Sequence, residues 1–136
     1  MITYKTTKSI FKEDLLALYN DAGWSSYTTD IDKLQRAIEN SYSVFSAWEN
    51  DILVGLVRSI SDGETICYIQ DILVLEAYKR KGIGKALIDK ILVQCNDIRQ
   101  IVLLTDAQDF DTRKFYESQS FKSCDDGFLV AFTKVD

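Results

Sequence analysis

The chain has 136 residues, 46% of them hydrophobic and 27% charged, with a formal net charge of −5 and a sequence pI near 4.7. This length suits one globular domain, 1–136, and the acidic balance argues against a nucleic-acid-binding surface, which needs an excess of Lys and Arg. No apolar run approaches the roughly 18 residues of a membrane span, and the N-terminus lacks the apolar segment of a signal peptide, so we expect a cytoplasmic protein without a membrane partner.

Two helices are predicted in the N-terminal third of the chain. Residues 9–22 carry apolar side chains near helical spacing, with Ser9 as the candidate N-cap and Gly23 as the candidate stop. Residues 30–40 show the same spacing. The polar stretch between them, GWSSYTT, is expected to be a loop.

A hairpin and a third strand are predicted next. SVFSAW and ILVGLVRSI read as strands joined at END, and TICYIQDILVL follows after a turn. The third strand is nearly continuous in apolar residues from Ile66 to Leu75, as expected of a central strand covered on both faces. Gln70 and Asp71 interrupt this apolar run.

The second half of the chain begins with a predicted strand–helix–strand unit. Residues 82–95 have helical spacing, and QIVLLTDA reads as another buried strand, which makes it parallel to the third strand, with a right-handed crossover. A short helix is predicted at DTRKFYESQ. Two further strands are expected at FKSC and FLVAFTKV, separated by a turn at DDG.

Composition also limits the available chemistry. The chain has no histidine, which excludes Ser-His and Cys-His nucleophile pairs and His-ligated metals. Proton transfer must therefore use a carboxylate, tyrosine, lysine, thiol or water. Cys67, Cys95 and Cys124 are odd in number and widely spaced, so we expect buried thiols rather than disulfides or a zinc site.

The segment YKRKGIGKAL places four basic residues and two glycines where the third strand gives way to the following helix. The first N–H groups of a helix have no partner within it and carry the positive end of its dipole, so they can bind phosphate. Gly82 and Gly84 would let an anion approach these groups closely. A solvated basic turn at a helix start accounts for the same residues.

Two known phosphate-binding patterns do not fit this segment. A P-loop requires Ser or Thr after its Gly-Lys pair, and here Ala86 follows Lys85. The dinucleotide fingerprint requires Gly or Ala where this chain has Leu87.

A third pattern fits. DILVLEAYKRKGIGKALI resembles the acyl-CoA signature of the GNAT superfamily of N-acetyltransferases, Gln/Arg-x-x-Gly-x-Gly/Ala, with Lys79 in the position of the Gln or Arg. FYESQSF is similar to a second family segment, Phe-Tyr-Glu-x-x-Gly-Phe, with Ser120 in place of the glycine. Asp109 stands where the family often has Asn. The resemblance covers about residues 43–135.

The resemblance implies an α/β (α+β) GNAT fold, in which a mixed, twisted sheet of about six to seven strands has helices on both faces. The strand ending near Val74 and the strand of Ile101–Leu104 would splay apart, and acetyl-CoA would enter the opening. A backbone N–H at Leu73 or Val74 would polarise the thioester carbonyl. The implied cofactor-binding residues are Ile72, Leu73, Val74, Lys79, Arg80, Lys81, Gly82, Ile83, Gly84, Lys85 and Asp109.

Two residues are candidates for proton transfer. Tyr116 matches the family tyrosine that protonates the departing thiolate, although a helix tyrosine packed at the sheet edge is also compatible with the sequence. Asp71 is a candidate base for the acceptor amine, because burial would raise the pKa of a carboxyl inside a strand. Simple solvation or pairing of Asp71 with Gln70 is the alternative. Glu64, Glu76 or a water relay could serve instead.

The acceptor remains open at this level. Trp24 and Tyr27 are candidate substrate-binding residues, or aromatic residues that anchor the loop. LYNDAGW and YIQDILV are similar to bacterial relatives of plastid arylalkylamine acetyltransferases, which implies a small aromatic amine. Protein lysine, a polyamine, an amino sugar and an aminoglycoside are alternatives. A CoA-binding regulatory module without turnover is the non-enzymatic alternative. The final strand and the sheet edges resemble those through which many GNAT proteins form homodimers.

Overall fold

The computed structural model of the protein describes residues 1–135. By its internal contacts the chain forms two compact units, Met1–Leu104 and a second unit that begins at Thr105. The first unit holds the whole sheet and the helices that pack on it, and each unit is described by itself below.

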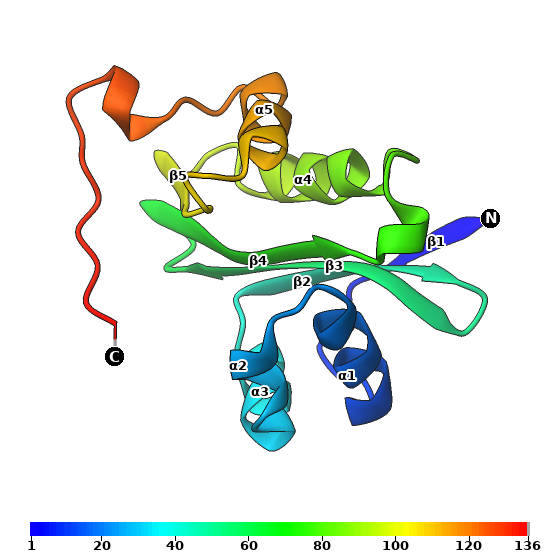
Figure 1. The fold of residues 1–136 in the computed structure, drawn as a ribbon. Helices are drawn as coiled ribbons and strands as arrows, with labels where there is room; N and C mark the ends of the chain where they lie inside the picture. Colours follow the sequence, from blue (N-terminus) through cyan, green and yellow to red (C-terminus); the bar gives the residue numbers. More distant parts are fainter. Residues whose placement is uncertain (136) are drawn as a thin grey trace. The chain divides into compact units, whose positions relative to one another are not determined.

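The first unit is built on a five-stranded sheet with the order β1-β2-β3-β4-β5 (Figure 1). The strands are β1 (Ile2–Lys5), β2 (Ser43–Glu49), β3 (Ile52–Ser61), β4 (Ile66–Val74) and β5 (Gln100–Leu103). Strands β1 to β4 pair antiparallel, and β5 pairs parallel with β4. The predicted hairpin, third strand and parallel strand–helix–strand unit are therefore confirmed. β1 was not expected, because four alternating residues are too short a pattern to identify a strand.

Helices cover both faces of this sheet. Three lie on one face, namely α1 (Lys12–Asp21), α2 (Ser25–Thr28) and α3 (Ile31–Glu39), and α4 (Ile83–Gln94) lies on the other (Figure 1). The predicted helices are confirmed, and Gly23 adopts a left-handed φ of 77° directly after α1. The Ser9 cap is wrong, because Phe11 is the N-cap residue. The expected loop contains the single turn α2, whose chain entry at Trp24 is fixed by a bond to the carbonyl of Tyr19.

Apolar side chains pack the helices against both faces of the sheet. On one face, α1 and α3 pack through a cluster that includes Leu15, Leu18 and Leu34, and burying each such side chain stabilises the fold by about 1.5–3 kcal/mol. On the other face, α4 lies close to Gly55 of β3, where a Cβ would be 3.2 Å from Ile83 Cγ2. The small size of Gly55 therefore fixes how closely the first turn of α4 approaches the sheet.

The second unit contains α5 (Phe110–Ser118) and a 3₁₀ turn at Cys124–Asp126. The predicted helix is confirmed, but the strands predicted at 121–124 and 128–135 are wrong, because these described residues form no strand. The sheet consequently has five strands instead of six or seven. A strand is stable only when neighbouring strands satisfy its N–H and C=O groups, and an alternating apolar pattern does not supply that neighbour.

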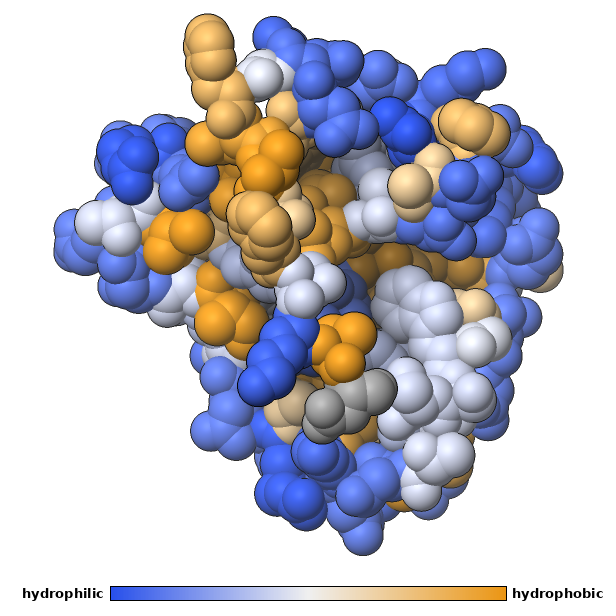
Figure 2. Space-filling model, turned by 60° about the vertical axis from the view of Figure 1, so that its left-hand side comes forward, coloured by the Kyte–Doolittle hydropathy of each residue, from blue (hydrophilic) through white to orange (hydrophobic). Residues whose placement is uncertain are grey.

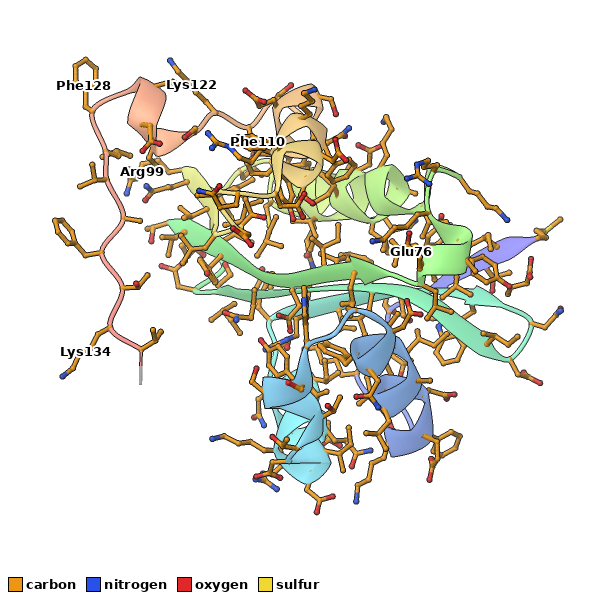
Figure 3. The ribbon with its side chains drawn as sticks, in the orientation of Figure 1. Glu76, Arg99, Phe110, Lys122, Phe128 and Lys134 are labelled. Carbon is orange, nitrogen blue, oxygen red and sulfur yellow. The ribbon has the colours of Figure 1, made fainter. Side chains whose placement is uncertain are left out.

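Apolar side chains of the C-terminal segment are exposed. Orange groups in the space-filling view show that apolar side chains reach the surface (Figure 2), and the stick view shows Phe128 directed away from the ribbon (Figure 3). The large apolar residues exposed in this segment are Phe128, Leu129, Val130, Phe132 and Val135. An apolar surface of this kind tends to find a partner.

The cysteines follow the expectation in part. Cys67 and Cys95 are buried free thiols, whereas Cys124 is exposed. Burial, together with a hydrogen bond to Cys67, raises the pKa of Cys95 to about 12. None of the helices in residues 1–135 combines the length and the apolar character needed to cross a membrane.

Candidate active site

The basic glycine loop lies where β4 leads into α4. After β4 ends at Val74, a 3₁₀ turn at Glu76–Tyr78 carries the chain to the loop, and Glu76 is labelled at this turn in Figure 3. The N–H of Glu76 donates to Asp21 Oδ2 at 2.8 Å, and the Tyr78 hydroxyl donates to Glu49 Oε1 at 2.6 Å. Contacts to α1 and to β2 therefore hold the chain as it enters the loop.

Gly82 is the N-cap residue of α4 and adopts a left-handed φ of 82°. A Cβ at Gly82 would meet no atom within 4 Å, so the position borders open space. Glycine has no side chain with which to cap the helix, so the N-cap residue leaves the first N–H groups of α4 without a side-chain acceptor. Arg80 also has a positive φ, of 64°, which is strained for a residue with a Cβ. This arrangement suits the close approach of a phosphate.

The basic side chains of the loop are exposed and make local contacts. Lys79 Nζ lies 2.9 Å from Glu76 Oε2, and Lys85 Nζ lies 2.7 Å from Asp89 Oδ2. Lys81 Nζ lies 5.1 Å from the centre of the Tyr78 ring. Ion pairs this exposed are weak, so a phosphate could replace the carboxylates at little cost. Ile83 differs from its neighbours because its side chain is buried against the sheet.

The end of β4 has one open edge. The parallel pairing with β5 runs from Ile66 to Ile69, whereas β4 continues to Val74. All four residues of β5 are paired, so the pairing ends because β5 ends at Leu103, and the expected splaying of the two strands stays a prediction. Beyond Ile69, no strand within residues 1–135 pairs with the edge of β4 that faces β5.

The direction of the backbone along this edge follows from one hydrogen bond. The N–H of Leu75 donates to the Val54 carbonyl of β3 at 2.9 Å. Backbone groups of successive strand residues point alternately to the two neighbouring strands. The N–H and C=O of Leu73 therefore face β3, and those of Ile72 and Val74 face the open edge. Of the two amides predicted to polarise a thioester, Val74 has the suitable direction.

A β-bulge at Gln70 determines which face of the sheet Asp71 occupies. Asp71 lies opposite Arg58 of β3, but Ile69 lies opposite Ser59, so Gln70 is an extra residue in β4. One extra residue reverses the alternation of side chains along a strand. Cys67 accordingly contacts Cys95 at the end of α4, whereas Asp71 points to α1 on the other face.

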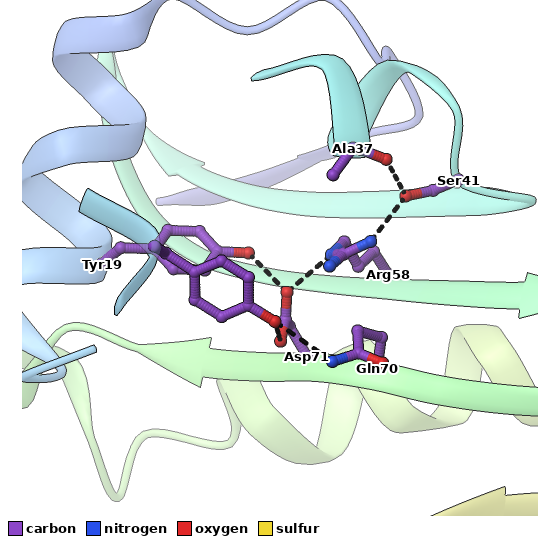
Figure 4. A network of polar contacts seen from close by, with 7 residues as sticks. Tyr19, Ala37, Ser41, Arg58, Gln70 and Asp71 are labelled. Carbon is purple, nitrogen blue, oxygen red and sulfur yellow. Dashed lines mark hydrogen bonds and ion pairs between the residues drawn. The ribbon is translucent and has the colours of Figure 1, made fainter. Parts of the chain in front are cut away.

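Asp71 is the centre of a buried polar network (Figure 4). Its Oδ2 atom lies 2.6 Å from Arg58 Nε and accepts a hydrogen bond from the Tyr19 hydroxyl at 3.1 Å. Its Oδ1 atom accepts from the Tyr27 hydroxyl at 2.8 Å. Only 3% of the Asp71 side chain is exposed, so these donors replace water around the carboxylate.

The network continues on both sides of the ion pair. Arg58 Nη1 donates to Ser41 Oγ at 3.4 Å, and that hydroxyl donates to the Ala37 carbonyl of α3 at 2.8 Å. On the opposite side, Gln70 Nε2 donates to the Tyr27 hydroxyl at 3.1 Å. Gln70 therefore bonds to Tyr27, and Arg58 is the charged partner of Asp71.

The candidate acceptor residues lie beside this network. Trp24 and Tyr27 are half-buried, and their rings contact the buried Tyr19 ring with centroids 5.8 and 5.2 Å away. Burial, and secondarily Asp71, raises the pKa of Tyr27, so its phenol is a neutral hydrogen-bond donor near pH 7. The two aromatic residues thus anchor α2 and also present part of their surface to solvent.

The alternative bases occupy less suitable positions. Glu64 lies in the turn before β4, at the opposite end of the strand from Val74. A hydrogen bond from Lys79 and the charge of that residue lower the pKa of Glu76, which makes it a weaker base. Asp71 is closer to the open edge, although its oxygens already accept hydrogen bonds.

Tyr116 and Asp109 belong to the second unit. Burial, with a smaller contribution from Asp109, raises the pKa of Tyr116 to about 12. The Tyr116 ring packs edge-on against Phe115 and Phe121, with centroids 5.3 and 6.0 Å away. Asp109 is the N-cap of α5 and accepts from the Thr112 N–H at 3.1 Å. The catalytic role of Tyr116 and the cofactor contact of Asp109 stay predictions.

A separate groove of about 540 Å³ lies elsewhere in the first unit. It runs along the later turns of α4, beside β1 and β2, and is lined by Tyr4, Phe45, Ala86, Asp89, Lys90, Val93 and Gln94. Its lining includes no residue of the glycine loop, so its position does not support an acyl-donor role.

Sequence reasoning missed Arg58 and Tyr19. A charged residue inside the apolar strand ILVGLVRSI was the available signal for Arg58, since a buried charge needs a partner. Tyr19 fits the apolar stripe of α1, and nothing in its spacing distinguishes a hydrogen-bonding tyrosine from a packing one.

The fold and the site together define an α/β protein with an open strand edge beside a basic, glycine-initiated helix. Residues 8–133 match the family model described as acetyltransferase (GNAT) domain. The chain therefore belongs to the GNAT acetyltransferase family, which confirms the resemblance of its two motifs.

Relatives from plants are similar over most of this chain. Histone acetyltransferase TAP1 of Glycine max is 33% identical over 132 residues, covering 88% of this chain and 55% of that protein. GCN5-related N-acetyltransferase 2, chloroplastic, of Arabidopsis thaliana is 31% identical over 142 residues, covering 88% of this chain and 53% of that protein. The chain thus spans about half the length of these relatives.

Solved structures agree with the fold. A GNAT family acetyltransferase from Streptococcus pneumoniae has a TM-score of 0.87 at 29% identity, covering 100% of this chain and 98% of that one. AAC(6')-Iy in complex with a bisubstrate analogue, CoA-S-monomethyl-acetylneamine, has a TM-score of 0.70 at 14% identity, covering 100% and 99%. The second likeness concerns the fold alone.

Proposed function

We propose that the protein is an acetyl-CoA-dependent N-acetyltransferase that acetylates a primary amine. The observation that carries this proposal is the placement of two different binding features at the end of one strand. The open edge of Ile72 and Val74 is followed within ten residues by the basic loop that starts α4. Acetyl-CoA has an amide-bearing arm and a pyrophosphate, which match the edge and the loop in turn.

Different groups of the chain would bind different parts of acetyl-CoA. N–H groups at the start of α4 and the side chains of Lys79, Arg80, Lys81 and Lys85 would hold the pyrophosphate. The backbone of Ile72 and Val74 would pair with the pantetheine amides, as a strand would. Asp109 stays a proposed contact of the same arm, from the family pattern.

Acetyl-CoA supplies a thioester whose acetyl group is transferred in a ternary complex. The amine nitrogen forms a bond to the carbonyl carbon, the carbon–sulfur bond breaks, and one proton leaves the nitrogen while one reaches the sulfur. The Val74 N–H would stabilise negative charge on the carbonyl oxygen, and such a donor is worth about 3–4 kcal/mol of barrier. Tyr116 would provide the proton for sulfur, and water or Asp71 would receive the proton from nitrogen.

For the acceptor we propose a small arylalkylamine. Half-buried Trp24 and Tyr27 give an aromatic surface on the α1–α2 side of β4. The acidic chain, with its net charge of −5, favours the approach of a cation. The likeness to the Glycine max histone acetyltransferase favours a protein lysine instead, and the likeness to AAC(6')-Iy favours an aminoglycoside.

An amine panel tests this proposal. Thiol release from acetyl-CoA would be followed with tryptamine, spermidine, a lysine-containing peptide and an aminoglycoside. We expect turnover above the hydrolysis rate with at least one of these amines, highest with tryptamine. CoA binding by calorimetry without turnover on any amine would instead support the regulatory module.

Two further properties are proposed from the sequence. We keep the cytoplasm as the location, with the chloroplast named for the Arabidopsis relative as the alternative. We also keep a homodimer, supported by the exposed apolar side chains of the C-terminal segment.

A further inference from the structure

The Asp71 carboxylate receives bonds from three different elements. Arg58 reaches it from β3, Tyr19 from α1 and Tyr27 from α2. Arg58 and Asp71 have opposite charges, and 7% and 3% of their side chains are exposed. A buried pair with this many partners fixes geometry more than it adds stability.

The Arg58 side of this network controls the donor edge, which is the open edge of β4 at Ile72 and Val74 where acetyl-CoA is proposed to bind. Arg58 and Asp71 face each other at the position where Gln70 bulges out of β4. Because the bulge reverses the alternation of the strand, it decides whether Ile72 and Val74, or Leu73, direct their amides to the open edge. The ion pair ties Asp71 to the residue opposite and so keeps the bulge at Gln70.

The Tyr27 side of the network holds the acceptor loop, which is the segment around α2 that carries the candidate acceptor residues Trp24 and Tyr27. α2 is a single turn with no buried residue, and a turn of this length is not stable by itself. The Tyr27 hydroxyl donates to Asp71 and accepts from Gln70, so two neighbouring residues of the bulge bind it. The contact of Tyr27 with Tyr19 adds ring packing to these two bonds.

We infer that Asp71 is a positioning residue that joins the donor edge of β4 to the acceptor loop through one buried carboxylate. This inference rests on the proposed function, and it assigns Arg58 and Tyr27 as its partners in that role. The general-base hypothesis for Asp71 makes a different prediction, because a base titrates in the reaction and must direct a free lone pair at the amine. Every Asp71 oxygen already accepts a bond from a buried or half-buried donor.

Three variants separate these two roles. Asp71→Asn keeps the side-chain shape but removes the charge, and Tyr27→Phe removes only the loop contact. Tyr4→Phe is the matched control, since Tyr4 is a half-buried tyrosine whose ring faces Lys90 of α4 on the opposite face of the sheet. CoA is the binding probe, measured by calorimetry, and amide hydrogen exchange is measured on the free protein.

For Asp71→Asn we expect CoA binding about tenfold weaker, comparable to the loss of one hydrogen bond. Exchange should be at least tenfold faster at the Leu73 amide and throughout α2. Tyr27→Phe should accelerate exchange in α2 only, with CoA affinity within twofold of wild type. The acidic limb of kcat/KM should persist in Asp71→Asn, because a positioning residue does not titrate in the reaction.

Wild-type CoA affinity and wild-type exchange in Asp71→Asn would overturn the inference, and a lost acidic limb in that variant would identify Asp71 as the base. If Asp71→Asn does not fold, Arg58→Lys decides, because it retains the positive charge but not the Nε contact. It should accelerate exchange at Leu73, and an unchanged rate there would equally refute the inference. Exchange is measured without CoA or an amine, so a wild type that binds no CoA would refute only the proposed function.

Discussion

The Nε atom of Arg58 lies 2.6 Å from the Oδ2 atom of Asp71, across the β3–β4 pairing. The two residues are 13 positions apart in the sequence, and both side chains are almost fully buried in the structure. Their position at the bulge links the stability of the sheet to the geometry of the candidate active site.

Breaking this pair should destabilise the fold strongly. Arg58→Met leaves an unpaired carboxylate in the core, and we expect the free energy of unfolding to fall by about 3–5 kcal/mol. The double variant Arg58→Met/Asp71→Leu removes both charges and should recover most of that loss. Urea denaturation followed by circular dichroism measures both. Equal losses in the single and double variants would contradict a stabilising role of charge compensation.

The glycine loop should bind CoA through its backbone. Gly82→Asp adds bulk and negative charge where a phosphate is expected, and CoA affinity should fall at least tenfold. Gly23→Asp is the matched control, because both glycines have φ near 80° and open space at the Cβ position. Both variants should lose about 1 kcal/mol of stability through strain. Similar CoA dissociation constants for the two variants would show that the site is misplaced.

Tyr116 should act as a general acid without titrating in the usual pH range. Burial raises the pKa of Tyr116 to about 12, so its phenol stays protonated below pH 10. Tyr116→Phe should lower kcat by about 10² to 10⁴, leaving CoA affinity and the pH profile between 6 and 10 unchanged. Because the folded pKa is above the unfolded value, the associated stability is present below pH 10 and declines above it. A variant with wild-type kcat would exclude this role.

Ser120 should be replaceable by glycine with a gain in stability. Its φ of 72° is a left-handed conformation that disfavours a side chain. Ser120→Gly should raise the free energy of unfolding by up to about 1 kcal/mol. Asn50→Gly, at φ 54°, is the comparison and should gain less, because Asn tolerates this conformation. Thermal unfolding of both variants measures the change in stability. A Ser120→Gly variant less stable than wild type would contradict the prediction that the backbone at Ser120 is strained.

The C-terminal segment should mediate the proposed homodimer. Light scattering should give twice the chain mass of 15.5 kDa for wild type. Phe132→Asp should shift the mass towards the monomer, because the Phe132 side chain is 92% exposed and available to a partner. Phe11→Asp, at a residue 76% exposed beside α1, serves as the control and should leave the mass unchanged. A wild-type monomer at high concentration would remove this proposal.

Local patterns in the sequence were sufficient for much of the fold. The spacing of apolar residues predicted α1, α3 and α4, and the parallel relation of β4 and β5 followed from chain connectivity. The glycine loop was also visible, because Gly82 and its basic neighbours are contiguous. These features depend on residues that are close in the chain, where periodicity and turn chemistry act directly.

The sequence by itself determined the family, the glycine loop and the candidate residues, since short motifs of contiguous residues carry all three. Only the tertiary structure decided which partners Asp71 has and which amides of β4 face the open edge. Both depend on the bulge at Gln70, and a bulge exists only relative to the register of the opposite strand. The strand expected at residues 128–135 was wrong for the same reason, because its apolar pattern specifies a suitable strand but not the neighbour that would pair with it.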